Sequence, residues 1–257
     1  MANVSDVRDC GESKFDETVA ECLKVFPNVQ TLRFEQKLCL LNLIRGKDVF
    51  TMLPTGFGKS IIFQLFPRVI KALQSCERIF TIIVVSPLVS IMRDQVEELK
   101  KLGFLAAAIG IEDSNEDEEK VRNGQCEIVF GSPESWLSKA WIKELKDGKL
   151  GKQTAAIALD EVHSVTEWGL LNGGKRKKKV NNPFREAFGR VKDIRSYLPG
   201  IPLIALTATV QFTERAKLFR ACGMQNPIVV DVSPNKENIS FNFIGILNEK
   251  DAVSCLK

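Results

Sequence analysis

The stretch that decides the fold of this chain covers residues 52–60 and reads Met52-Leu53-Pro54-Thr55-Gly56-Phe57-Gly58-Lys59-Ser60. An apolar, strand-like segment (48–51) precedes it, and a helix-like segment (61–65) follows it. Glycines let the backbone of such a turn curl until its N–H groups point at phosphate oxygens, and the helix N-terminus adds the positive end of its dipole. The turn predicts a nucleotide triphosphate site in which Lys59 reaches the β- and γ-phosphates and Ser60 ligates Mg²⁺.

One position departs from the general phosphate-loop pattern. That pattern, G-x-x-x-x-G-K-[ST], has glycine where Leu53 stands here. The tripeptide Gly58-Lys59-Ser60 also occurs in solvated turns that carry a surface lysine. This alternative stays open until the other motifs are considered.

Length and composition are those of an ordinary globular chain. Its 257 residues suit one large domain or two small ones, with 44% hydrophobic and 26% charged residues. No apolar run reaches the length of a membrane span, and the N-terminus lacks the features of a secretory signal. Seven scattered cysteines without a C-x-x-C pair, with a single histidine, exclude a plausible zinc set and predict reduced thiols in an intracellular protein.

The formal net charge of +4 comes from one place. The cluster Lys175–Lys179 carries five positive charges, and without it the net charge is −1. The basic balance therefore does not predict a broad electropositive face.

Strand-like and helix-like segments alternate along the chain. The expected strands are near-continuous apolar runs at 49–53, 79–86, 105–110, 127–131, 154–159, 202–207 and 228–231. The expected helices are 16–25, 36–44, 60–73, 89–102, 116–123, 135–146, 183–197 and 212–222. Alternation of this kind predicts an α/β, doubly wound, mostly parallel sheet flanked by helices, with ligands at the carboxyl ends of the strands.

A second motif follows one of these apolar strands. Asp160-Glu161-Val162-His163 delivers two adjacent carboxylates to the edge of the sheet. Beside a phosphate turn, the first acid can hold Mg²⁺ and the second can polarise the water that attacks the γ-phosphate. A third motif, Ala205–Thr209, ends the strand 202–207, and its hydroxyls are expected to bond to this cluster.

Taken together, the chain resembles the RecQ-like DNA helicases of helicase superfamily two over roughly residues 20–245. The helicase form of the phosphate turn does not require the first glycine, so Leu53 fits it. The matching motifs, in chain order, are Leu32–Gln36, Leu53–Ser60, Ser86–Gln95, Gly131–Glu134, Asp160–His163, Thr166–Gly169 and Ala205–Thr209. The resemblance implies a RecA-like P-loop fold of three layers that binds ATP and Mg²⁺.

The resemblance also implies roles for the nucleotide-binding positions. Arg33 and Gln36 would recognise adenine, with the Gln36 amide acting as both donor and acceptor. Ser60 and Asp160 would hold Mg²⁺, and Glu161 would activate water. The remaining implied residues are the turn (Thr55, Gly56, Phe57, Gly58, Lys59), catalytic Lys59 and His163, and the coupling group that joins His163 to Thr207, Ala208 and Thr209.

DNA contacts are implied elsewhere on the same edge. Ser86, Pro87, Ser132 and Pro133 would follow a single strand, contacting its phosphates through hydroxyls and backbone N–H groups. Trp168 would stack on an unpaired base, or would be an ordinary core tryptophan.

Two departures from the family pattern bear on function. After Trp168 the chain enters a basic insertion, 170–182, in place of the usual His-Asp-Phe-Arg. Its cluster Lys175–Lys179 would bind DNA phosphates, act as a nuclear import signal, or be a solvated charged loop. After Thr209 only 48 residues follow, too few for the second RecA-like domain, which carries the arginine fingers in this family.

The predicted organisation is a leader with a short helix (1–30), a helicase ATP-binding domain (31–235) and the start of a linker to a second lobe (236–257). The predicted function is the ATP-binding lobe of a 3′–5′ DNA helicase that acts on single-stranded or branched DNA in the nucleus, and is incomplete as a motor alone. The alternatives are a non-catalytic, nucleotide-gated nucleic-acid-binding module, an RNA helicase or another superfamily-two translocase, and a cytoplasmic location.

Overall fold

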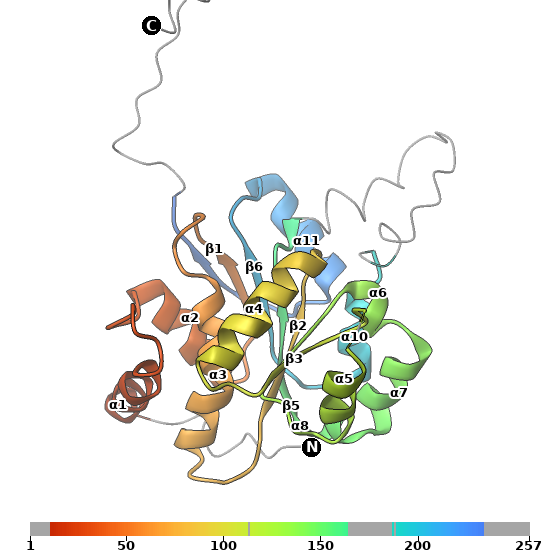
Figure 1. Ribbon diagram of the computed structural model, residues 1–257. Helices are drawn as coiled ribbons and strands as arrows, with labels where there is room; N and C mark the ends of the chain where they lie inside the picture. Colours follow the sequence, from red (N-terminus) through yellow and green to blue (C-terminus); the bar gives the residue numbers. More distant parts are fainter. Residues whose placement is uncertain (1–10, 113, 164–186, 188, 234–257) are drawn as a thin grey trace, which may run out of the picture.

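A seven-stranded parallel sheet forms the centre of the molecule in the computed structural model, which describes residues 11–112, 114–163, 187 and 189–233 (Figure 1). The strand order is β3-β4-β2-β5-β6-β1-β7, and every described pairing is parallel. The strands are β1 (Val49–Met52), β2 (Thr81–Val85), β3 (Ala106–Ile109), β4 (Ile128–Gly131), β5 (Thr154–Leu159), β6 (Leu203–Thr207) and β7 (Ile228–Asp231). All seven were predicted from their apolar runs.

Buried side chains alternate between two cores along each central strand, because successive strand residues point to opposite faces. In β2, for example, Ile82 and Val84 belong to one core, and Ile83 and Val85 to the other. The first core lies under the helices α1 (Glu12–Leu23), α2 (Phe34–Ile44), α3 (Ser60–Leu73) and α4 (Val89–Lys101). The second lies under α5 (Asn115–Arg122), α6 (Pro133–Trp136), α7 (Lys139–Asp147), α8 (Lys149–Gln153), α10 (Val191–Tyr197) and α11 (Arg215–Cys222). These are the predicted three layers.

One expected helix is wrong, since 135–146 is divided into α6 and α7. Ser132 caps α6 and Ser138 caps α7, each accepting a hydrogen bond from the backbone N–H three residues later. A serine that satisfies the free N–H groups of a new helix start favours a break at that position. The structure also adds α8, which was not expected, and begins the segment 212–222 with a 3₁₀ turn, η4 (Phe212–Glu214).

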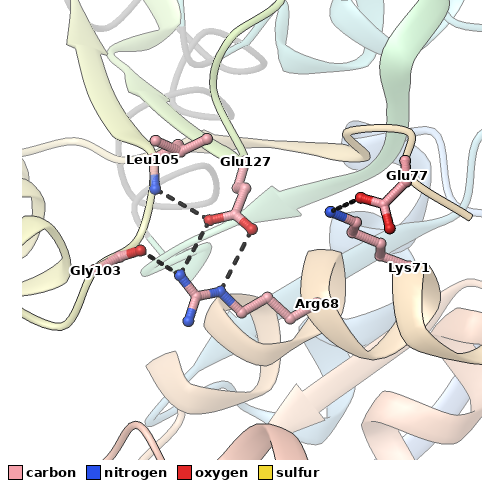
Figure 2. Close-up of polar contacts among 6 residues, drawn as sticks. All are labelled: Arg68, Lys71, Glu77, Gly103, Leu105 and Glu127. Atoms are coloured by element: carbon pink, nitrogen blue, oxygen red, sulfur yellow. Dashed lines mark hydrogen bonds and ion pairs between the residues drawn. The ribbon is translucent and has the colours of Figure 1, made fainter.

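The amino edge of the sheet is held together by ionic contacts (Figure 2). The Arg68 guanidinium on α3 lies 3.4 Å from each oxygen of the Glu127 carboxylate, and it also donates to the Gly103 carbonyl. The same carboxylate accepts the Leu105 N–H at 3.0 Å. These contacts fix α3 to the segments that enter β3 and β4, and leave the opposite edge to the predicted motifs.

Candidate nucleotide-binding site

The phosphate turn connects β1 to α3 at the carboxyl edge of the sheet, as the sequence predicts. Gly56 and Gly58 have φ angles of 81° and 82°, in the left-handed region that glycine adopts without strain. A Cβ on Gly58 would lie 2.8 Å from Nε2 of Gln36, so the turn has no room for a side chain there. The helix α3 then begins at Ser60, which directs its first free N–H groups toward the turn.

Lys59 lies within this turn and contacts its first residue. Its Nζ donates to the Leu53 carbonyl at 3.2 Å. The Leu53 N–H in turn donates to the Thr207 carbonyl at 3.1 Å, which joins the turn to the end of β6. Position 53 therefore contributes backbone groups, and its side chain is fully buried. This explains why a leucine is compatible with the turn.

Gln36 lies against the turn, but its amide is already engaged. Its Oε1 accepts the Arg33 N–H at 2.8 Å, and its Nε2 donates to the carbonyls of Phe57 at 2.9 Å and Gly58 at 3.0 Å. Only 5% of the residue is exposed. The amide holds the turn in this structure, so an adenine that uses the same groups has to replace some of these bonds.

A cavity of about 690 Å³ opens beside the turn. Six predicted residues line it: Arg33, Gln36, Gly56, Phe57, Gly58 and Ser60. Gln64, Gln95 and Glu98 also line it and were not predicted, although Gln64 lies one helical turn after Ser60. The exposed Thr55 is not among the lining residues. The volume falls in the range of small-molecule sites.

The acid pair follows β5, on the same edge of the sheet. The Asp160 N–H donates to the Val85 carbonyl at 2.9 Å, which fixes it against β2. Although part of the residue remains exposed, burial of its carboxyl raises the pKa of Asp160 to about 6, and the neighbouring Glu161 adds to this effect. Lys59 and His163 act in the opposite direction. A desolvated carboxylate is stabilised by a bound cation such as Mg²⁺.

Glu161 has an unusual backbone conformation. Its φ angle is 47°, in the left-handed region that glutamate rarely adopts. Such conformations persist where the surrounding structure enforces them and cluster at functional sites. Here the Glu161 N–H donates to the Asp160 carboxylate at 3.0 Å, and the Val162 N–H donates to the Leu206 carbonyl at 2.9 Å.

His163 lies between the acid pair and the end of β6. Its Nδ1 lies 3.2 Å from the Glu161 carboxylate and 3.3 Å from Oγ1 of the fully buried Thr207. That Oγ1 also accepts the Thr209 N–H at 3.3 Å. Thr207 thus makes the expected contact with the cluster, whereas Thr209 contributes its backbone and exposes its side chain. Ala208 lies between them and is half-buried.

The residues expected to contact DNA lie at the carboxyl ends of the neighbouring strands β2 and β4. The Ser86 N–H donates to the Gly131 carbonyl at 3.1 Å, so the two segments lie side by side. Ser86, Pro87 and Pro133 are buried, and the Ser132 hydroxyl caps α6. In this structure these side chains therefore pack within the protein or cap a helix. Trp168, the insertion 170–182 with Lys175–Lys179, and residues 236–257 lie outside the described residues.

The described residues contain neither a membrane-spanning helix nor a cluster of metal-ligating side chains. No helix in that part of the chain is long and apolar enough to cross a membrane. The same residues contain no group of three or more histidine, cysteine, aspartate or glutamate side chains arranged to hold a metal ion.

The fold and the site define a P-loop domain of the helicase type. The DEAD/DEAH box helicase family matches residues 33–218, and the chain belongs to that family. It is 34% identical over 207 residues to the ATP-dependent helicase SGS1 of Saccharomyces cerevisiae, covering 77% of this chain and 13% of that protein. It is 25% identical over 240 residues to the ATP-dependent DNA helicase RecQ of Pasteurella multocida, covering 92% and 34%. The chain thus spans about a third or less of these relatives' lengths, and the resemblance to RecQ-like helicases is confirmed.

Solved structures show the same fold. The helicase MrfA bound to DNA and AMPPNP superimposes with a TM-score of 0.61 at 19% identity, covering 87% of this chain and 30% of that one. A hypothetical ATP-dependent RNA helicase from Sulfolobus tokodaii gives a TM-score of 0.53 at 16% identity, covering 85% and 56%. These similarities confirm the RecA-like architecture.

Proposed function

We propose that this chain is the ATP-binding lobe of a RecQ-like DNA helicase, which couples ATP hydrolysis to 3′–5′ movement along single-stranded DNA. The observation that carries the proposal is a continuous series of polar contacts at the carboxyl edge of the sheet. It runs from Lys59 through the backbone of Leu53 to Thr207, and from Thr207 through His163 to Glu161. Such a series joins the residue expected at the phosphates to the residue expected to activate water.

Each group in the site has a task in this proposal. The backbone N–H groups of 56–60 and the Lys59 ammonium bind the phosphates, and Ser60 and Asp160 hold the metal. A bound Mg²⁺ would neutralise charge that develops on the transferring phosphate. Glu161 orients and polarises the attacking water, and His163 holds the Glu161 carboxylate in place. Thr207 transmits the state of this cluster to β6 and the phosphate turn.

The domain boundaries are part of the proposal. We assign the ATP-binding domain to 31–235, with 1–30 as a leader and 236–257 as the start of a linker. The resemblance places the arginine fingers in a second lobe, and without such a finger hydrolysis is about 10³-fold slower or more. The chain alone is therefore expected to hydrolyse ATP weakly and not to unwind DNA.

Steady-state hydrolysis with single-stranded DNA, single-stranded RNA or no nucleic acid tests the function. The proposal predicts slow hydrolysis that DNA stimulates more than RNA, and its loss in Lys59→Ala. Lys71→Ala is the matched control, because Lys71 lies on the same helix α3 and pairs only with the exposed Glu77 in the described structure. Greater stimulation by RNA would favour an RNA helicase. Nucleic-acid binding without any Lys59-dependent hydrolysis would favour the non-catalytic binding module.

We also propose a nuclear location, for which Lys175–Lys179 is the supporting feature. Replacement of these five residues by alanine should move a fluorescently tagged chain to the cytoplasm. An unchanged nuclear signal would show that the cluster is not the import sequence. DNA repair and recombination are the processes in which RecQ-like helicases would use such a motor.

A further inference from the structure

An aromatic ring occupies the middle of the phosphate turn. Phe57 stands between the two glycines with positive φ, and its ring packs at the edge of the first hydrophobic core. The guanidinium carbon of Arg33 lies 4.4 Å from the centroid of this ring. The contact joins the segment before α2 to the segment after β1, and both residues line the same cavity.

Arg33 contacts the ring and is at the same time an exposed residue. A guanidinium is a planar, delocalised cation that stacks on aromatic rings, including nucleobases. The guanidinium carbon lies over the Phe57 ring, and the cavity beside it is also bordered by Val29 and Gln36. The Gln36 amide is engaged with Arg33, Phe57 and Gly58. Stacking on Arg33, unlike hydrogen bonding to Gln36, leaves the bonds of the Gln36 amide intact.

We propose that Phe57 is a positioning residue for the nucleobase, whose ring holds the Arg33 guanidinium flat so that its other face stacks on a purine. The inference rests on the proposed nucleotide-binding function and adds a residue that sets affinity for the base. The phosphates are bound by backbone groups and Lys59, so the ring contributes nothing to them directly. Affinity for the base and affinity for the phosphates are therefore separable.

The test compares two ligands that share phosphates but not a base. Dissociation constants of Mg²⁺–ATP and Mg²⁺–tripolyphosphate are measured by calorimetry for the full chain and for Phe57→Ala. Loss of a cation–π platform should raise the dissociation constant of ATP about tenfold and leave that of tripolyphosphate within about twofold. Phe57→Tyr keeps the ring and should restore ATP binding. If Phe57→Ala does not fold, Phe57→Leu keeps apolar volume without the ring and takes its place.

Two further variants make the test specific. Arg33→Lys keeps the charge but removes the planar face, so it should weaken ATP binding to a similar extent, and adding Phe57→Ala to it should have little further effect. Phe212→Ala is the matched control, because the centroid of the Phe212 ring lies 5.3 Å from the Arg215 guanidinium carbon, while Phe212 is 81% exposed and is not among the residues that line the cavity. It should change neither dissociation constant.

The outcomes separate this inference from the function on which it rests. Equal weakening of ATP and tripolyphosphate in Phe57→Ala would overturn the inference, because the ring would then merely shape the turn. Unchanged ATP binding would overturn it as well. If the unaltered chain binds neither ligand, the proposed nucleotide-binding function itself fails.

Discussion

Asp48 and Asp160 lie at opposite ends of the parallel strands, Asp48 just before β1 and Asp160 just after β5. The Asp48 carboxylate is 3% exposed and accepts hydrogen bonds from Arg195, from the Leu203 N–H at 3.0 Å and from the Gln225 N–H at 2.7 Å. Within the described residues, the Asp160 carboxyl accepts a hydrogen bond from the Glu161 N–H, and burial raises its pKa to about 6. At the amino edge the Asp48 carboxylate is compensated by an arginine and by backbone N–H groups. At the carboxyl edge the Asp160 carboxylate is desolvated, and a cation would stabilise it.

The same contrast extends to the neighbours of the two aspartates. At the amino edge, Glu127 binds Arg68 on α3 and the Leu105 N–H. At the carboxyl edge, Glu161 adopts a left-handed φ angle, and Lys59 donates to the Leu53 carbonyl. Polar groups that are satisfied within the protein stabilise it, whereas groups held in unfavourable surroundings are typical of functional sites. The amino edge therefore supports the fold, and the carboxyl edge is available for chemistry.

Removing the amino-edge carboxylate should have the largest effect on stability. Asp48→Ala leaves the largely buried Arg195 guanidinium and two backbone N–H groups without their partner. We expect the free energy of unfolding in urea to fall by about 3–5 kcal/mol, the usual effect of breaking a buried ion pair. Asp147→Ala, at an exposed aspartate on α7, should leave it unchanged. A small change in Asp48→Ala would show that the two edges do not differ in this way.

Removing the Asp160 charge at the carboxyl edge should raise the free energy of unfolding, whereas Asp48→Ala should lower it. Between pH about 4 and 6, the folded state holds a proton on Asp160 that the unfolded state releases, so stability falls as pH rises through this window. Without Mg²⁺ or nucleotide, Asp160→Asn should be more stable than the unaltered chain by about 2 kcal/mol at pH 7.5, after allowance for partial exposure. The difference should vanish near pH 4.

Urea unfolding at several pH values measures this difference, and a Mg²⁺–nucleotide titration provides the second observation. Bound Mg²⁺–ATP should stabilise the unaltered chain by mass action and Asp160→Asn much less, since the amide cannot replace a carboxylate at the metal. An Asp160→Asn variant that is less stable than the unaltered chain at every pH would contradict the comparison. It would mean that Asp160, like Asp48, stabilises the fold.

Much of the fold follows from local sequence. Strands such as Thr154–Leu159 are apolar throughout and buried on both faces, so their runs were visible without any structure. A single helix is expected at 135–146 because the helical spacing of its apolar residues gives no sign that Ser138 caps a new helix. The periodicity of apolar residues predicts which face of a helix is buried. It does not predict where one helix ends and the next one starts.

The site also contains some features that the sequence predicts and others that it does not. The phosphate turn and the acid pair are contiguous motifs, and the sequence predicted both. The Arg33–Phe57 contact joins residues that are distant in the chain, and the left-handed φ of Glu161 depends on the packing of β5 against its neighbours. The bonds of Gln36 to the turn also join residues that are distant in the chain. The sequence therefore predicts adenine recognition for this amide, and it does not predict that the amide holds the turn. Such features arise from tertiary structure and have no local signal.

The smallest effect is expected from the ion pairs of the amino edge. Glu127→Gln keeps an acceptor for the Leu105 N–H but removes the charge that faces Arg68, and both partners are largely buried, with side chains 14% and 22% exposed (Figure 2). The free energy of unfolding should fall by about 1 kcal/mol, as for a charge-assisted hydrogen bond that becomes neutral. Glu77→Gln is the matched control, because Glu77 pairs with Lys71 at 3.5 Å in full contact with solvent and should produce no measurable change. Equal effects of the two variants would mean that the Arg68–Glu127 pair contributes no more to stability than the exposed Lys71–Glu77 pair. The amino edge would then be stabilised by Asp48 and by hydrophobic packing.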